Sequence, residues 1–185
     1  MDNIGKAFNS KRYPTKINSI RVQSYEVWRH MVVRCGYHLT PPNINYTDVA
    51  ISDSWQDYSN FHEDVKDMVG YGTDFVLDKD LLIKGNRVYC KENCCFVPEE
   101  INVALVKSDR TMGEYLIGVD FHKKTGKFRA RHKKHLGLFN TEIEAFNAYK
   151  SAKESYLKEL AEKWKDKIDP RAYEALMKYK VEITD

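Results

Sequence analysis

The chain has 185 residues, of which 42% are hydrophobic and 12% aromatic, and its formal net charge is only +3. This apolar content predicts a folded protein with one domain or two small ones. No apolar run approaches the ~20 residues that span a bilayer. A polar stretch follows Met1, where a signal peptide would place an apolar core. We therefore expect neither a membrane protein nor a secreted one, but a cytoplasmic protein.

The first part of the chain predicts an arm, a helix and a loop. Residues 1–22 are polar, and we expect them to form a flexible or loosely docked arm. From Ser24, a plausible N-cap, apolar residues follow at helical spacing as far as Gly36. The stretch 37–53 contains two adjacent prolines and several asparagines, which predicts an irregular loop.

A second helix is predicted to begin between Asp57 and Asn60 and to be closed by Gly70. We expect Trp28 and Trp55 to anchor the core of this half. Further along, two apolar runs flank the tripeptide 84–86, which predicts a β-hairpin. A helix is then predicted from Pro98 to about Leu105. The expected order is strand, strand, helix.

The four cysteines do not have the spacing of a zinc site. Three of them fall within residues 90–95 and the fourth is remote, whereas structural zinc sites pair their ligands in C-x2-4-C units. A chain of this size without an export signal is expected to keep its thiols reduced. The preferred interpretation is that they are small buried hydrophobic residues, and zinc is not expected. These residues are Cys35, Cys90, Cys94 and Cys95.

The positive charge is concentrated near residue 130. The window from Phe121 to His135 contains no Asp or Glu, and alternation within 127–132 predicts a strand with one basic and one largely apolar face. Such a basic stripe is the electrostatic footprint of nucleic-acid binding, although lysines also serve solubility. The predicted DNA-binding residues are Lys123, Lys124, Lys127, Arg129, Arg131, Lys133 and Lys134.

This strand belongs to a small predicted module. We expect strands at about 115–121, 127–132 and 135–139, followed by a helix that Thr141 and Glu144 begin with a capping box. The module resembles the plant ethylene-response-factor domain, the APETALA-two fold, and the resemblance implies a sheet that binds the DNA major groove. It covers about residues 115–155, and the matching residues are Gly118, Val119, Gly126, Lys127, Phe128, Leu136, Gly137, Phe139, Thr141, Glu144, Ala145, Ala148, Tyr149 and Ala152. The helix is predicted to run toward Trp164, and Asp169 with Pro170 begins a final one.

The first half resembles the phage-encoded HNH endonucleases, whose ββα unit holds one divalent metal ion. In that unit an acid ends the first strand and an asparagine lies just before the helix. The residues that carry the resemblance are Tyr25, Trp28, Met31, Arg34, Cys35, Trp55, Phe61, Leu77, Asp78, Lys79, Asp80, Lys84, Gly85, Asn86, Asn93, Cys94, Phe96, Val97, Pro98, Ile101 and Asn102. The resemblance implies that Asp78 and Asn93 bind Mg²⁺ or Mn²⁺ and that Asn86 braces the hairpin.

The usual base histidine of the HNH pattern is replaced by Lys79. A charged lysine is better suited to binding or stabilising a phosphate than to accepting a proton. His30, His38 and His62 are alternative bases. The interpretation without a metal is that Asp78 and its neighbour Asp80 cap a turn, and that Asn93 makes an Asx-type bond.

The sequence thus predicts an α+β protein with three parts: an arm over 1–22, a helical and ββα nuclease domain over 23–107, and a DNA-binding domain over 113–185 in which a three-stranded antiparallel sheet packs on a helix and a C-terminal helix follows. The expected function is a metal-dependent DNA endonuclease of HNH or homing type, with duplex DNA as partner and a place in the host cytoplasm near the nucleoid. One alternative is an inactive phage protein that binds DNA or blocks a host defence protein. A weaker one is a binder of an acidic protein surface.

Overall fold

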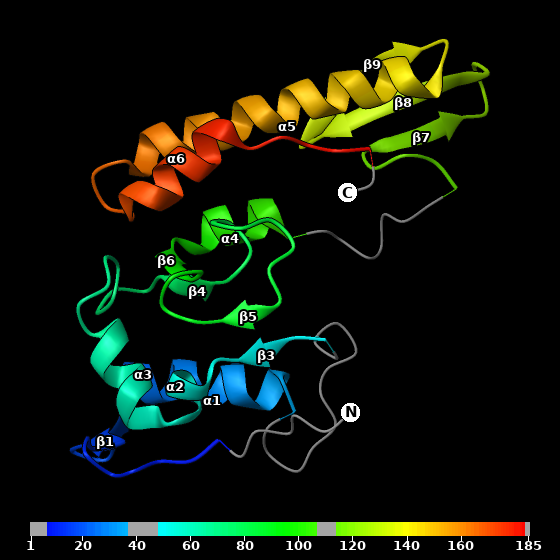
Figure 1. The fold of residues 1–185 in the computed structure, drawn as a ribbon. Helices are drawn as coiled ribbons and strands as arrows, with labels where there is room; N and C mark the ends of the chain where they lie inside the picture. The colour runs from blue at the N-terminus through cyan, green and yellow to red at the C-terminus, as the bar shows by residue number, and fades with distance from the viewer. Residues whose placement is uncertain (1–6, 37–47, 107–113, 184–185) are drawn as a thin grey trace. The chain divides into compact units, whose positions relative to one another are not determined.

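The computed structural model describes residues 7–36, 48–106 and 114–183 and confirms the α+β class. The chain forms two compact units (Figure 1). Residues 1–102 with 166–172 make unit 1, and residues 103–165 with 173–185 make unit 2. The boundary expected between 107 and 113 lies outside the described residues.

Three helices of unit 1 enclose two tryptophans. They are α1 (Gln23–Arg34), α2 (Asp53–Gln56) and α3 (Tyr58–Val65). Trp28 and Trp55 are 3% and 1% exposed, and the indole N–H of Trp28 donates to the carbonyl of Trp55 over 2.8 Å. This bond satisfies the one polar group that Trp28 buries. The two tryptophans thus anchor the core as expected, whereas α2 was not predicted.

The predicted cap of α1 is wrong. The N-cap is Val22, whose side chain makes no capping bond. Ser24 lies in the first turn and is completely buried, with its hydroxyl 2.7 Å from Nδ1 of His62 and 3.2 Å from the hydroxyl of Tyr58. The serine therefore joins α1 to α3, because a buried hydroxyl needs polar partners wherever they lie.

The described part of the predicted arm is docked against the start of α3, which was one of the two expected alternatives. Phe8 forms a parallel β-bridge with Asp57, the N-cap of α3. The Asp57 carboxylate accepts the backbone N–H of Ser59, which caps the helix, and also that of Ser10, both at 3.0 Å. One carboxylate oxygen satisfies two amides, which fixes the arm against α3. Residues 1–6 lie outside the described part of the chain.

A pair of short parallel strands also departs from expectation. Strand β3 (Ala50–Ile51) pairs with β5 (Val88–Tyr89), with the Ser52 N–H bonded to the Tyr89 carbonyl at 3.0 Å. The loop predicted over 37–53 is thus wrong at 50–51, and residues 37–47 lie outside the described part. A strand of two residues is too short to show an alternation of apolar and polar residues in the sequence. It can be recognised only by its pairing with a distant strand.

The ββα order is present, but its strands pair differently from the predicted hairpin. Strand β4 (Val76–Asp78) runs antiparallel to β6 (Cys95–Val97), with Asp78 opposite Cys95, and α4 (Glu99–Leu105) follows. The tripeptide 84–86 does not join paired strands, because β5 pairs with β3 instead. The long segment between β4 and β6 carries the candidate metal site.

Unit 2 contains an antiparallel sheet, a long helix and most of the helix that follows it. The sheet consists of β7 (Val119–His122), β8 (Lys127–His132) and β9 (Lys134–Phe139), with β8 in the centre. Helix α5 (Glu142–Trp164) packs along it (Figure 1). It begins with the expected Thr141–Glu144 capping box. Helix α6 (Pro170–Lys178) follows α5.

Gly118 lets α5 approach the sheet closely. Its φ is +76°, and a Cβ atom there would lie 2.1 Å from the Tyr149 ring of α5. A non-glycine residue would meet both a strained backbone and a steric clash. This turn also explains why β7 begins at Val119 and not near 115, since the Val119 N–H bonds to the Leu116 carbonyl in a turn.

Candidate nucleic-acid interface and metal site

One face of the sheet in unit 2 is basic and the other is covered by α5. On the covered face Ala130 is completely buried. Lys127 and Arg131 are exposed on the opposite face, where pairing places Asp120 beside Arg129 and His122 beside Lys127. Directly opposite residues of an antiparallel pair share a face. Lys127, Arg129 and Arg131 therefore form a basic face, and this name is used for them below.

Asp120 holds the two arginines of the basic face together. Its carboxylate lies 2.8 Å from the Arg129 guanidinium and 2.9 Å from that of Arg131. Partial burial would raise the pKa of Asp120, but the hydrogen bond from Arg129 and the charges of both arginines hold it below its ordinary value. The side chains of Arg129 and Arg131 remain 31% and 59% exposed. Two guanidiniums aligned in this way suit the oxygens of a phosphate. The Asp120 carboxylate offsets one of their two positive charges.

The other four predicted DNA-binding lysines divide into three groups. Lys123 and Lys124 are exposed in the turn between β7 and β8, and Lys134 is exposed at the start of β9. Lys133, with φ +55°, directs its ammonium to 3.5 Å from the centre of the Tyr156 ring on α5. That cation–π contact turns Lys133 toward the helix, so it does not extend the basic face.

Replacing Asp120 by Asn is expected to strengthen binding of non-specific duplex DNA about fivefold to tenfold at 0.1 M salt. One additional net positive charge steepens the dependence of log K on log salt by about 0.9. Fluorescence anisotropy with a labelled duplex at several salt concentrations measures both quantities. Glu159→Gln, an exposed residue of α5, makes the same charge change elsewhere in unit 2. Weaker binding by Asp120→Asn alone would show that aligning the arginines matters more than their net charge.

In unit 1, Asp78 ends β4 and caps the turn that follows. Its Oδ1 accepts the backbone N–H groups of Asp80 at 2.9 Å and Leu81 at 2.7 Å. Burial raises the pKa of Asp78 above its ordinary value, although these two bonds act in the opposite direction. The turn-capping interpretation of Asp78 therefore holds for one carboxylate oxygen. Its Oδ2 accepts no hydrogen bond from any described residue.

Asn86 connects the loop after β4 to the loop before β6. Its side-chain N–H groups donate to the carbonyls of Lys79 at 2.8 Å and Val88 at 2.7 Å. Its Oδ1 accepts from the Asn93 side chain at 3.1 Å. Asn93 precedes β6, so it is not directly before α4 as expected. This hydrogen bond between the two side-chain amides orients Asn93. The Asn93 Oδ1 accepts no hydrogen bond from a described residue.

Lys79 is held inside this loop system. Its ammonium donates to both carboxylate oxygens of Asp80, at 2.6 and 2.8 Å, and to the Asn86 carbonyl at 3.0 Å. Its side chain is only 10% exposed. In all three bonds the ammonium is the donor, so they fix the loop between β4 and β5. This environment favours an electrostatic and structural role for Lys79 and not proton abstraction.

The alternative histidines occupy other environments. His62 bonds Ser24, packs on the ring of Tyr13, and has its pKa lowered by burial. His30 is exposed beside Arg29 and Glu26 on α1. His38 lies outside the described residues. The described contacts of His62 and His30 are thus structural ones within the N-terminal helices.

The donor set at Asp78 and Asn93 fits a hard cation in its chemistry. The candidate ligand atoms are Asp78 Oδ2 and Asn93 Oδ1, which accept no hydrogen bond from a described residue. Mg²⁺ takes such oxygens, keeps several waters, and completes its shell with substrate phosphate. The part of the chain that the structure describes contains no group of three or more His, Cys, Asp or Glu side chains arranged for a metal. The candidate site therefore depends on one carboxylate and one amide.

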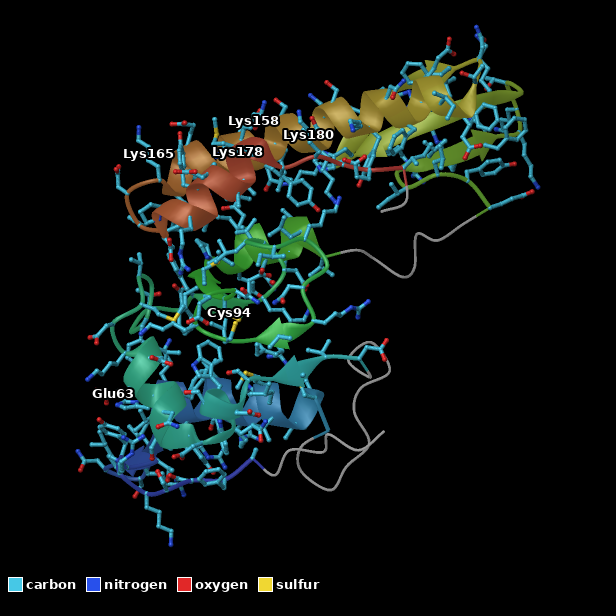
Figure 2. The ribbon with its side chains drawn as sticks, viewed as in Figure 1. Glu63, Cys94, Lys158, Lys165, Lys178 and Lys180 are labelled. Carbon is cyan, nitrogen blue, oxygen red and sulfur yellow. The ribbon has the colours of Figure 1, made fainter. Side chains whose placement is uncertain are left out.

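Three cysteines lie close to Asn93 in sequence and Cys35 is remote, and the buried ones have a packing role. Cys94, labelled in Figure 2, and Cys95 are completely buried, and Cys35 is 8% exposed. Burial raises the pKa of Cys35 to about 11 and those of Cys94 and Cys95 further. Thiols with such pKa values stay protonated at neutral pH, which makes them poor nucleophiles and poor ligands. Cys90 is partly exposed.

Comparison of this chain with family models, with curated proteins and with solved structures finds no match. No helix among the described residues is both long and apolar enough to cross a bilayer.

Proposed function

We propose that this protein is a metal-dependent DNA endonuclease of the HNH type that binds duplex DNA through its basic face. The observation that carries the proposal is the β4–β6–α4 unit, in which Asp78 ends the first strand and the Asn86 amide orients Asn93. In this proposal Asp78 Oδ2 and Asn93 Oδ1 would supply protein ligands for Mg²⁺ or Mn²⁺. The basic face of unit 2 supports duplex DNA as the substrate.

Each residue has a defined task in this proposal. Asp78 and Asn93 would hold the divalent ion, which would supply stabilisation of negative charge on the scissile phosphate and the leaving oxygen. Asn86 orients Asn93, and Lys79 fixes the loop while adding positive potential. The basic face holds the DNA backbone. Because Lys79 is committed to hydrogen bonds, proton transfer from the attacking water is assigned to solvent, which predicts a rate that rises with pH.

The proposal is tested by incubating the full chain with supercoiled plasmid and with linear duplex DNA. Nicked or linear products are expected with Mg²⁺ or Mn²⁺, and no product is expected after chelation with EDTA. The rate is expected to rise between about pH 7 and 9, since hydroxide then replaces a protein base. Tight binding without product in either metal would contradict the endonuclease function and would leave only DNA binding.

The second candidate function is DNA binding without hydrolysis, either for occupancy of DNA or for blocking a host defence protein. The ion pair between Lys79 and Asp80 favours it, because the residue at the base position is tied up. It requires the basic face and not the Asp78 carboxylate. The plasmid assay therefore separates the two candidates.

A further inference from the structure

A small β-hairpin in unit 1 exposes two isoleucines to solvent. Strands β1 (Lys16–Ile17) and β2 (Ile20–Arg21) pair antiparallel with Ile17 opposite Ile20. Asn18 and Ser19 form the two-residue turn, with φ of +50° and +66°. Ile17 and Ile20 are 60% and 74% exposed, although isoleucine is among the residues most often buried. Paired side chains at the tip of a ribbon form an apolar projection, which we call the isoleucine tip.

The surroundings of the isoleucine tip are basic. Residues 7–22 contain no Asp or Glu and carry four cations, Lys11, Arg12, Lys16 and Arg21. A shallow concave surface beside the tip is lined by Lys16, Ser19, Ile20, Arg21 and Glu26. Glu26 is its one acid, and it is bonded to Arg21 at 2.7 Å. An apolar tip surrounded by positive side chains is complementary to a polyanion whose interior is apolar.

We propose that the β1–β2 hairpin is a second DNA-binding element, which inserts the isoleucine tip into the minor groove of duplex DNA. Ile17 and Ile20 contact sugars and wedge against a base step, and Lys16 and Arg21 contact the flanking phosphates. Apolar wedges of this kind unstack a base step and kink the duplex by 20–90°. This inference rests on the proposed DNA-binding function but not on hydrolysis or on the basic face.

The docked base of the arm is what makes such a wedge effective. Phe8 and Ser10 are bonded to the segment before α3, and the Tyr58 hydroxyl donates to the Pro14 carbonyl at 3.1 Å. The Val22 N–H closes the hairpin by bonding to the Thr15 carbonyl at 3.0 Å. A hairpin fixed at both ends transmits force to a base step, whereas a free arm would only follow the groove.

The test compares the full-length protein with the double variant Ile17→Ser/Ile20→Ser on a 30-base-pair duplex labelled at both ends for energy transfer. The wild type is expected to bend the duplex. The variant is expected to lose the bend and at least fivefold in affinity, with an unchanged dependence on salt, because no charge is removed. A matched control is Val33→Ser/Val69→Ser, which alters two other exposed apolar residues of unit 1. A minor-groove ligand such as distamycin is expected to compete with the wild type.

Other results would overturn the inference in separate ways. Equal bending and affinity in wild type and Ile17→Ser/Ile20→Ser would show that the tip does not contact DNA. Failure of the wild type to bind any duplex would instead contradict the proposed function itself. Equal binding of the wild type to uncharged-lipid vesicles and to DNA would assign the tip to a lipid surface. Circular dichroism melting checks that the variant is folded, as expected for side chains this exposed.

Discussion

Asp78→Asn is expected to abolish metal-dependent cleavage while leaving the protein folded. In the proposed mechanism a bound metal would contribute several kcal/mol to stabilising charge on the phosphate, and each 1.4 kcal/mol is tenfold in rate. Loss of its one carboxylate ligand is therefore expected to slow cleavage about a thousandfold. Asn retains a side-chain oxygen that can accept the N–H groups of Asp80 and Leu81. Plasmid cleavage and thermal melting of the same preparation measure both effects.

The stability of this variant also has a defined pH dependence. Burial raises the pKa of Asp78 in the folded state, so the protonated carboxyl favours folding. That contribution is complete below the unfolded pKa of about 3.9 and is lost as pH rises through the higher folded value. At pH 7 without metal, Asp78→Asn is therefore expected to be at least as stable as the wild type. Below about pH 4 the difference should disappear.

Asp78→Ala serves as the matched comparison, because it removes the metal ligand and the turn cap together. Its loss of free energy of unfolding is expected to be about 1–3 kcal/mol, since two turn amides lose their acceptor. The two variants should be equally inactive but differently stable. Cleavage by Asp78→Asn at the wild-type rate would show that Asp78 is not a metal ligand and acts only as a turn cap.

Features set by neighbouring residues were predictable from the sequence. The capping box of α5 needs only Thr141 and Glu144, and the alternation of β8 needs only six consecutive residues. The start of α3 likewise follows from Asp57, which caps it. Each of these depends on contacts within one turn or one strand, so its signal is local.

Features that depend on distant partners were missed. Strand β3 exists because Ala50 pairs with Val88, and the docking of the arm, which the sequence left as one of two alternatives, depends on the pairing of Phe8 with Asp57. Asp120 was missed for a different reason, since it stands one residue before the acid-free window. Its place on the facing strand was the available signal, because register would have paired it with Arg129.

The residues of the candidate metal site remain a prediction from the sequence, and their contacts could not be predicted from it. Asp78 at a strand end and Asn93 just before a helix were taken from a family pattern, which gives identity and order, whereas Asn93 in fact precedes strand β6. The link through Asn86 and the ion pair of Lys79 with Asp80 arise from the fold of a loop, and loop geometry has no periodic signal. The first contact orients Asn93, and the second engages the Lys79 ammonium in hydrogen bonds.

Removing the basic face is expected to be the most damaging change for DNA binding. The triple variant Lys127→Gln/Arg129→Gln/Arg131→Gln should reduce the slope of log K against log salt by about 2.7, because each phosphate contact contributes about 0.9. At 0.1 M salt this corresponds to a loss of affinity on the order of a few hundredfold. The loss should be slightly larger because Asp120 is left without its two partners and repels the backbone. Anisotropy titrations at about 50 to 300 mM salt measure the affinity and the slope of log K against log salt.

A matched control removes the same number of charges from the helices of unit 2. Lys158, Lys165 and Lys178, labelled in Figure 2, are exposed on α5, at its C-cap and on α6. Their triple replacement by Gln lowers the net charge equally, so a change caused by overall charge would appear in both variants. If only the variant of the basic face shows a reduced dependence of log K on log salt, the basic face is the DNA-binding surface. Equal losses in the two variants would assign binding to general electrostatic attraction, and the aligned pair of guanidiniums on β8 would then have only a structural role.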